Sequence, residues 1–387
     1  MLVESSAETA IAKTFHRFIG HSVPFGHLLY AKKLLVMKLA LANDVDVLGN
    51  LLDRLSERNR WYRDFTLEAL SRAVRETIAC FPVYRTYVEP GQPVTEEDQE
   101  IVERAITAAK RRNPAMEESI FNFLCDVLLL RSPQGLDAAG RDVHAQFVLK
   151  FQQTTGPVMA KGLEDTLFYI YNRLPALNEV GGEPQQFGLS VEVFHERNID
   201  RQRDWPATLL ATSTHDTKRS EDVRARVVAI SEIPELWRRS LQRWGTANHR
   251  WKRMVNDLEA PDSNEEYLLY QTLLGTWPMQ ANGEPEPVPS PDYIERIQAY
   301  MRTHAPDFRP LLFDRRRETC NFFFSSAIVA HRSCTFWCSR AEQRTVPIVN
   351  APPRMRAVLV CVLAIRRQLL RVTRHCSKGP SPLTRSR

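Results

Sequence analysis

His215 and Asp216 are adjacent ionisable residues at the centre of a polar stretch, residues 211–222. An apolar run, residues 207–211, precedes them and predicts a strand, and a helix-like segment follows. Enzymes of the α/β class often place their reactive groups where a strand ends, because that position is rigid and open to solvent. A carboxylate beside an imidazole can stabilise positive charge, bind a sugar hydroxyl or hold a metal. The alternative is a charged strand-to-helix loop in which Asp216 or Thr217 is the N-cap of the helix.

A second candidate lies in residues 151–166, where Gly156 and Gly162 bracket Lys161 and the acids Glu164 and Asp165 follow. The aromatic residues Phe168, Tyr169 and Tyr171 come directly afterwards. Donors, acceptors and rings on an irregular backbone suit a polyol ligand, since hydroxyls need hydrogen-bond partners and sugar faces stack on rings. The alternative is a turn with a satisfied ion pair. Residues 177–182 form a further polar loop that contains Glu179.

The composition is that of a soluble globular protein, with 387 residues, 43% hydrophobic and 25% charged. From residue 311 onward, 15 Lys and Arg stand against 3 Asp and Glu, a charge of +12, whereas the whole chain carries +6. The basic charge therefore belongs to one end and is weak evidence for nucleic-acid binding. Seven cysteines without regular spacing do not resemble a secreted disulfide framework. The chain has no signal-peptide pattern and no long apolar stretch, so we expect a cytoplasmic protein without membrane contact.

The elements that must position these residues are mostly helical. Apolar periodicity and capping residues predict helices over 8–20, 27–58 with a break near Asn43, 67–80 after Thr66, 95–112, 119–130, 143–153, 234–244, 267–276 and 292–302. Alternation predicts a strand over 81–88 and indicates another over 187–194. We expect Trp237 and Trp244 to lie in the core rather than at a ligand.

Several separate blocks are similar to maltooligosyl trehalose synthase, a glucan-rearranging family of the α-amylase superfamily. The blocks occur in the family's order and are residues 29–55, 61–66, 79–87, 151–172, 177–182 and 211–226. The resemblance covers residues 8–302 and corresponds to the middle-to-late part of such an enzyme. It implies a helix-rich α/β fold, an incomplete (β/α)8 barrel with an inserted helical subdomain. The expected domains are a helical subdomain at 1–150, the later barrel at 151–302 and an unpatterned basic tail at 303–387, typical of a frameshift or an unrelated fusion.

The resemblance also implies a reaction and site residues. The family converts the reducing-end α-1,4 bond of a maltooligosaccharide into an α,α-1,1 bond by intramolecular transglucosylation, without a cofactor or metal. Asp216 matches the family's aspartate that stabilises the transition state, and His215 matches its sugar-binding histidine. Lys161 and Arg219 resemble substrate-contacting positions, and we expect Glu164, Asp165 and Glu179 to contact substrate too. The oligomeric state is not predicted.

The sequence departs from the family in one respect that matters for activity. Retaining glycoside chemistry needs a nucleophile and a general acid in addition to Asp216, and no stretch here resembles the blocks that carry them. We therefore expect the chain to be inactive alone. Two alternatives remain: a metal phosphohydrolase in which His215 and Asp216 bind metal with His144 and His195, and a helical binding module without enzymatic activity.

Overall fold

The protein consists of two compact units, one formed by residues 23–168 and the other by residues 1–22 together with 169 onward. The computed structural model describes residues 3–22, 24–131, 136–255, 257–281 and 285–304. The expected basic tail at 303–387 lies outside this range except for its first two residues. No helix among the described residues is long and apolar enough to cross a bilayer.

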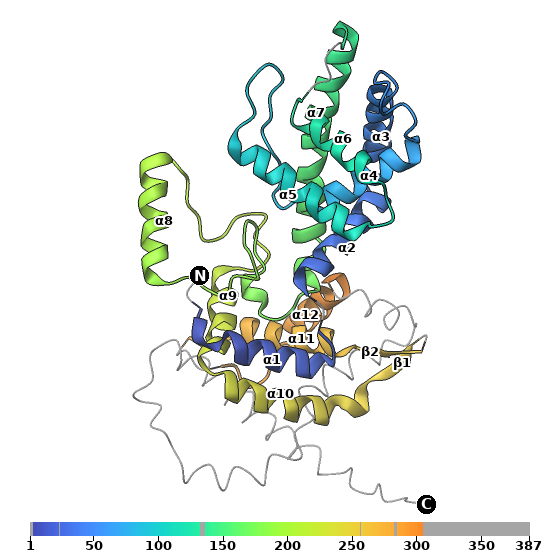
Figure 1. Ribbon diagram of the computed structural model, residues 1–387. Helices are drawn as coiled ribbons and strands as arrows, with labels where there is room; N and C mark the ends of the chain where they lie inside the picture. The colour runs from blue at the N-terminus through green and yellow to red at the C-terminus, as the bar shows by residue number, and fades with distance from the viewer. Residues whose placement is uncertain (1–2, 23, 132–135, 256, 282–284, 305–387) are drawn as a thin grey trace, which may run out of the picture. The chain divides into compact units, whose positions relative to one another are not determined.

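The regular secondary structure in the described part of the unit of residues 23–168 is helical (Figure 1). Its helices are α2 (Phe25–Leu39), α3 (Ala42–Ser56), α4 (Leu67–Cys80), α5 (Glu96–Arg112), α6 (Glu118–Leu128) and α7 (Ala138–Met159). Helix α3 packs against both α4 and α7, and α5 packs against α4 and α6. The predicted caps are confirmed: Thr66 Oγ1 accepts a hydrogen bond from Ala69 N at 3.2 Å, and Thr95 Oγ1 accepts one from Asp98 N at 3.1 Å. Side-chain capping of the exposed first turn stabilises a helix by about 1 kcal/mol.

The segment between α4 and α5 is extended, but it is not the predicted strand over 81–88. Side chains instead form hydrogen bonds with the backbone of Tyr87 and Val88. Gln152 on α7 accepts a hydrogen bond from Val88 N at 2.7 Å and donates one to Val88 O at 3.0 Å. Asp98 accepts from Tyr87 N at 3.1 Å. An extended segment needs partners for its amides and carbonyls, and here a carboxamide and a carboxylate replace a neighbouring strand.

The other unit is helical too, with a small antiparallel sheet of two strands in its described part. Its elements are α1 (Glu8–Ile19), α8 (Val191–Asp204), α9 (Glu221–Val228), α10 (Pro234–Asn248), β1 (Arg253–Val255), β2 (Leu258–Ala260), α11 (Ser263–Thr276) and α12 (Pro291–His304). Helix α1 packs against α10 and α11 and ends at Gly20, whose φ of 79° is left-handed. Glycine adopts this conformation without the strain that a Cβ would add.

Aromatic residues form the core of this unit, as expected for Trp237. The Trp237 indole is buried and donates a hydrogen bond to the Tyr267 hydroxyl at 3.0 Å. The rings of Phe15 and Tyr267 meet edge to face with centroids 5.1 Å apart. This cluster joins α1, α10 and α11.

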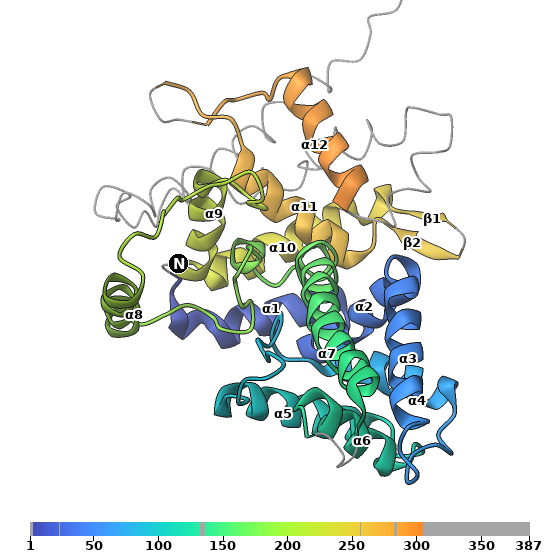
Figure 2. The ribbon, with the colours of Figure 1, turned by 90° about the horizontal axis from the view of Figure 1, so that it is seen from above.

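Two segments interpreted as strands have other structures. Residues 191–204 form α8, whose N-cap Ser190 accepts a hydrogen bond from Val193 N at 3.3 Å, and no α8 side chain is buried. Residues 207–211 are irregular, and Leu209 is 98% exposed. A strand forms only where a neighbouring strand pairs with it, and the described residues provide none here. Figures 1 and 2 show α8 attached through long irregular segments on both sides.

The boundary between the units also differs from the expected one at residue 150. Helix α7 continues past 150 to Met159 and is followed by a π-helical turn, Ala160–Glu164, that packs against α2. Residues 151–168 therefore belong to the helical unit, and residues 1–22 belong to the other.

Candidate functional site

The predicted site residues fall into two groups, one in each unit. Lys161, Glu164 and Asp165 lie in the helical unit, on or just after the π turn that follows α7. His215, Asp216, Arg219 and Glu179 lie in the other unit, in the irregular segments before α9.

In the helical unit the π turn presents its charged side chains at the surface. Lys161 Nζ lies 3.6 Å from Asp165 Oδ2, and both side chains are about half exposed. Glu164 accepts a hydrogen bond from the Tyr84 hydroxyl, and burial with this contact raises the pKa of Tyr84. Gly162 faces inward, where a Cβ would lie 3.0 Å from Cγ of Lys33. The ion pair between Lys161 and Asp165 agrees with the alternative interpretation, a turn with a satisfied ion pair. Both side chains are nevertheless exposed enough to contact a ligand.

The aromatic residues that follow do not act as a set of stacking platforms. Phe168 is 1% exposed and Tyr171 is 9% exposed, so both rings belong to the core. Tyr169 is half-buried, and Lys218 Nζ lies 5.7 Å from its ring centroid. The expectation that these rings bind sugar faces is therefore wrong for Phe168 and Tyr171, because their apolar area is already covered by protein.

In the other unit His215 and Asp216 are the exposed part of the site. His215 Nε2 lies 3.1 Å from Asp216 Oδ2, and the side chains are 90% and 69% exposed. Neither Asp216 nor Thr217 is the N-cap of α9, which is Ser220. Thr217 instead closes a tight turn around the pair: its Oγ1 accepts a hydrogen bond from Thr214 N at 2.7 Å, and its N–H donates to Thr214 O at 3.2 Å.

Glu179 fixes the C-terminal side of this loop. Its carboxylate accepts hydrogen bonds from the backbone N–H groups of Lys218, at 2.8 Å, and Arg219, at 3.4 Å. Arg224 Nη1 on α9 lies 3.5 Å from the same carboxylate, and both side chains are largely buried. Glu179 thus acts as a support of the loop. Its predicted role as a substrate contact is not what this geometry favours, because its oxygens are turned toward the protein.

Glu221 and Arg224 fix the N-terminal side, and sequence reasoning missed both. Glu221 accepts hydrogen bonds from the hydroxyls of Thr212 and Ser213, which lower the pKa of its carboxyl. Arg224 donates to the carbonyl of Thr212. The sequence feature that could have indicated this role is the pair Thr212 and Ser213, eight or nine positions before Glu221. Only the folded loop brings their hydroxyls to the Glu221 carboxylate.

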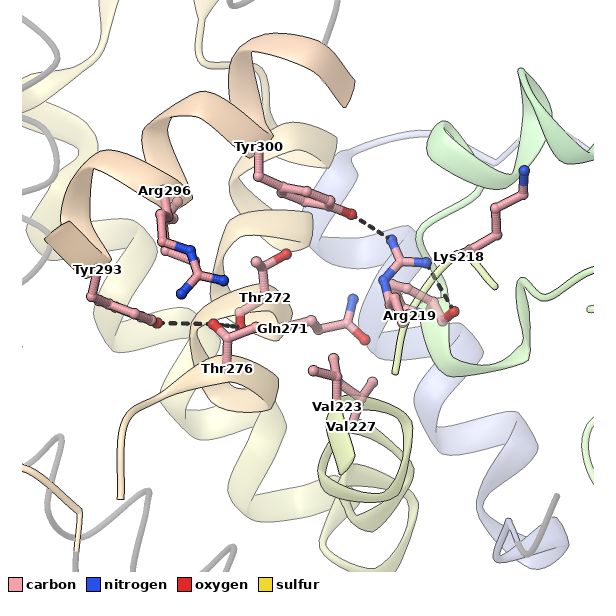
Figure 3. A pocket seen from close by; sticks show the side chains of 12 residues that line it. Lys218, Arg219, Val223, Val227, Gln271, Thr272, Thr276, Tyr293, Arg296 and Tyr300 are labelled. Carbon is pink, nitrogen blue, oxygen red and sulfur yellow. Dashed lines mark hydrogen bonds between the residues drawn. The ribbon is translucent and has the colours of Figure 1, made fainter. Parts of the chain in front are cut away.

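Arg219 is buried beneath the loop rather than exposed to a long substrate. Its guanidinium donates to Pro175 O at 3.2 Å and to the Tyr300 hydroxyl at 3.0 Å. It lines a cavity of about 280 Å³ together with residues of α9, α11 and α12 (Figure 3).

The described part of the chain contains no set of side chains that could bind a metal ion, as the metal phosphohydrolase alternative would require. His144 is buried in the helical unit with Nε2 2.7 Å from Val127 O, and burial lowers its pKa. His195 is exposed on α8 and contacts the ring of Phe194. No three His, Cys, Asp or Glu side chains among the described residues converge on a common point that could hold a metal ion. A metallohydrolase needs such a convergence.

The chain is similar to maltooligosyl trehalose synthases in sequence and in fold, although no family model matches it. A segment of 131 residues is 43% identical to putative maltooligosyl trehalose synthases from two strains of Mycobacterium tuberculosis, and covers 34% of this chain and 16% of theirs. The maltooligosyltrehalose synthase structure from Arthrobacter ramosus matches 97% of this chain with a TM-score of 0.59 and 24% identity. A hypothetical maltooligosyl trehalose synthase from Sulfolobus tokodaii matches 92% with a TM-score of 0.57 and 23% identity. The chain spans 39% and 40% of these two structures.

Proposed function

We propose that this chain carries the part of a maltooligosyl trehalose synthase that binds the glucan and stabilises the transition state. The observation that carries the proposal is the exposed His215–Asp216 pair, on a loop held at both ends, in a chain similar to these synthases. The reaction would be the isomerisation of the reducing-end α-1,4 bond of a maltooligosaccharide into an α,α-1,1 bond, which makes the enzyme a glucosylmutase.

In this proposal Asp216 supplies negative charge where the sugar ring becomes cationic. Breaking a glycosidic bond develops an oxocarbenium-like centre, and a fixed carboxylate stabilises it without having to reorganise. His215 would donate or accept a hydrogen bond with a hydroxyl of the same sugar. In the helical unit, Lys161 and Glu164 on the π turn and Asp165 just after it would form hydrogen bonds with glucan hydroxyls.

Turnover would require two further carboxyl groups, a nucleophile and a general acid. No stretch of the sequence resembles the blocks that carry these two groups in the family. We therefore propose that this chain binds maltooligosaccharides but does not rearrange them alone. We also propose that residues 169–302 correspond to later barrel segments and that residues 23–168 correspond to the inserted helical subdomain.

Calorimetric titration with maltopentaose, together with an assay for loss of reducing ends, tests both parts. We expect measurable binding that weakens about tenfold, or about 1.4 kcal/mol, in Asp216→Asn and His215→Ala, and no product. His249→Ala is the matched control, since His249 is an exposed histidine of the same unit. An absence of glucan binding would overturn the proposed function, and clear formation of a non-reducing product would overturn the proposed inactivity.

A further inference from the structure

A cavity of about 280 Å³ lies within the unit that contains α9, α11 and α12. Its lining includes three basic residues, Lys218, Arg219 and Arg296, and no Asp or Glu. Figure 3 shows Arg219 and Arg296 on different walls, one from the loop before α9 and the other from α12. Guanidinium groups on different walls of one small cavity create a positive potential in its interior, which favours an anion.

Arg219 is fixed in this cavity by neutral partners. It is 9% exposed, and its guanidinium donates to a carbonyl and to a phenol hydroxyl, on Pro175 and Tyr300. No described carboxylate forms an ion pair with its side chain. A buried cation that has no counterion is costly, so its charge is available for a negatively charged ligand.

Gln271 gives a second and independent indication of what the cavity binds: its side-chain oxygen lacks a hydrogen-bond donor. Its side chain is 1% exposed and lies on the cavity wall, where Figure 3 shows the carboxamide turned toward Arg219. The amide nitrogen donates to Asn172 O at 2.9 Å, which fixes the orientation of the carboxamide. The oxygen, Oε1, is buried and has no hydrogen-bond partner in the described protein. A buried acceptor needs a donor, and an anionic group alone does not provide one.

Hydroxyl groups of α11 and α12 also line the cavity. Thr276 Oγ1 donates to Thr272 O at 2.7 Å and lies 2.9 Å from the Tyr293 hydroxyl. Figure 3 shows the Arg296 guanidinium turned toward these threonines. The cavity therefore combines cations for an anionic group with an amide oxygen and hydroxyls for neutral polar groups.

From these observations we propose that the cavity binds a monosaccharide phosphate. The phosphate would contact the arginines, which match its oxygens in geometry and charge. A sugar hydroxyl would donate to Gln271 Oε1. The volume of about 280 Å³ lies just below the range of about 300–1,000 Å³ for small-molecule sites, so the cavity suits one phosphorylated sugar ring and not a glucan chain. This site goes beyond the proposed function, because Asp216 does not line the cavity and a glucan is neutral.

Titration calorimetry of the full chain with glucose 6-phosphate, inorganic phosphate and glucose tests the proposal. We expect glucose 6-phosphate to bind at least about tenfold more tightly than either part alone, because only the whole ligand satisfies both the cations and Gln271. Equal affinity for glucose 6-phosphate and inorganic phosphate would overturn the proposal, and so would the absence of binding.

Substitutions then locate the site. Arg296→Gln should weaken glucose 6-phosphate binding about tenfold without unfolding the protein, since Arg296 is an exposed position of α12. Arg302→Gln is the matched control on the same helix, outside the cavity lining. Gln271→Met should reduce the preference for glucose 6-phosphate over phosphate. Equal losses in Arg296→Gln and Arg302→Gln would place the binding elsewhere and overturn the proposal.

Discussion

The carboxylate of Glu179 accepts a hydrogen bond from the backbone N–H of Lys218 at 2.8 Å, across 39 residues of sequence. The same carboxylate contacts Arg219 N and the guanidinium of Arg224. One buried acid thus joins the loop at 178–182 to the loop that carries His215 and Asp216. The exposed pair is positioned by residues that a ligand does not reach, as a preorganised site requires.

Replacing Glu179 should loosen this loop and destabilise the fold. Glu179→Ala removes the carboxylate that accepts from the Lys218 amide and pairs with Arg224 Nη1, and we expect a loss of about 2–3 kcal/mol in the free energy of unfolding. Urea denaturation measures the loss, and amide hydrogen exchange should become faster across residues 211–220. Glu183→Ala, at an exposed acid in the adjacent segment, is the control. Unchanged exchange in Glu179→Ala would show that the loop is held by other contacts.

Local signals in the sequence predicted most of the helices, although α8 was interpreted in part as a strand. Gly20, Thr66 and Thr95 mark helix ends through contacts with residues a few positions away, so a short window contains the whole interaction. The extended segment at 81–88 could not be assigned in this way. Its partner is Gln152, whose carboxamide pairs with Val88 across 64 residues.

The sequence identified residues of the candidate site, but it did not indicate which of them are exposed to a ligand and which support the loop. His215 and Asp216 are exposed, as a ligand-binding pair must be, whereas Glu179 and Arg219 are turned into the protein. A sequence pattern identifies the charged residues of a loop but does not indicate which of them support the others. Glu221 was missed because its hydroxyl partners become neighbours only when the loop closes.

Lys161 offers a test of the surface role of the π turn. Its ion pair with Asp165 is half exposed and should contribute no more than about 0.5 kcal/mol to stability. Lys161→Ala should therefore leave the urea midpoint almost unchanged while weakening maltopentaose binding about fivefold. Lys38→Ala, at an exposed lysine of the same unit, should change neither quantity. A maltopentaose affinity unaffected by Lys161→Ala would remove this residue from the binding site.

The segment of α8 and the loop after it should promote self-association. Large apolar side chains are exposed along it at Val191, Phe194, Ile199, Trp205, Leu209 and Leu210. Such a concentration of exposed apolar area favours association in water. Replacing Leu209 and Leu210 together by serine should increase the monomer fraction in light scattering and change the free energy of unfolding by less than about 0.5 kcal/mol. Leu39→Ser, at an exposed leucine outside the segment, should not increase the monomer fraction.

Lys33 should make the stability of the protein depend on pH in the alkaline range. Lys33 is 1% exposed, and its ammonium group donates a hydrogen bond to Phe81 O at 2.7 Å. Burial lowers the pKa of Lys33 from 10.5 to about 8. Between these two values the unfolded chain holds a proton that the folded chain has released, so the folded state gains stability as pH rises through this window. Below pH 8 both states are protonated and the full cost of the buried charge is present.

Comparing the wild-type protein with Lys33→Met isolates this contribution. Burial raises the pKa of the Cys80 and Cys125 thiols to about 11 from 9.0, which opposes the trend above pH 9 in both proteins. The Cys125 contribution cancels in the difference, whereas that of Cys80 cancels only in part, because the charge of Lys33 lowers the pKa of Cys80. The wild-type protein should gain about 2 kcal/mol relative to Lys33→Met between pH 7 and pH 9.5. Urea denaturation at the two pH values measures the gain, and Lys38→Met, at an exposed position of the same helix, should show none. A difference between wild type and Lys33→Met that does not vary with pH would mean that the ammonium group is solvated in the folded protein.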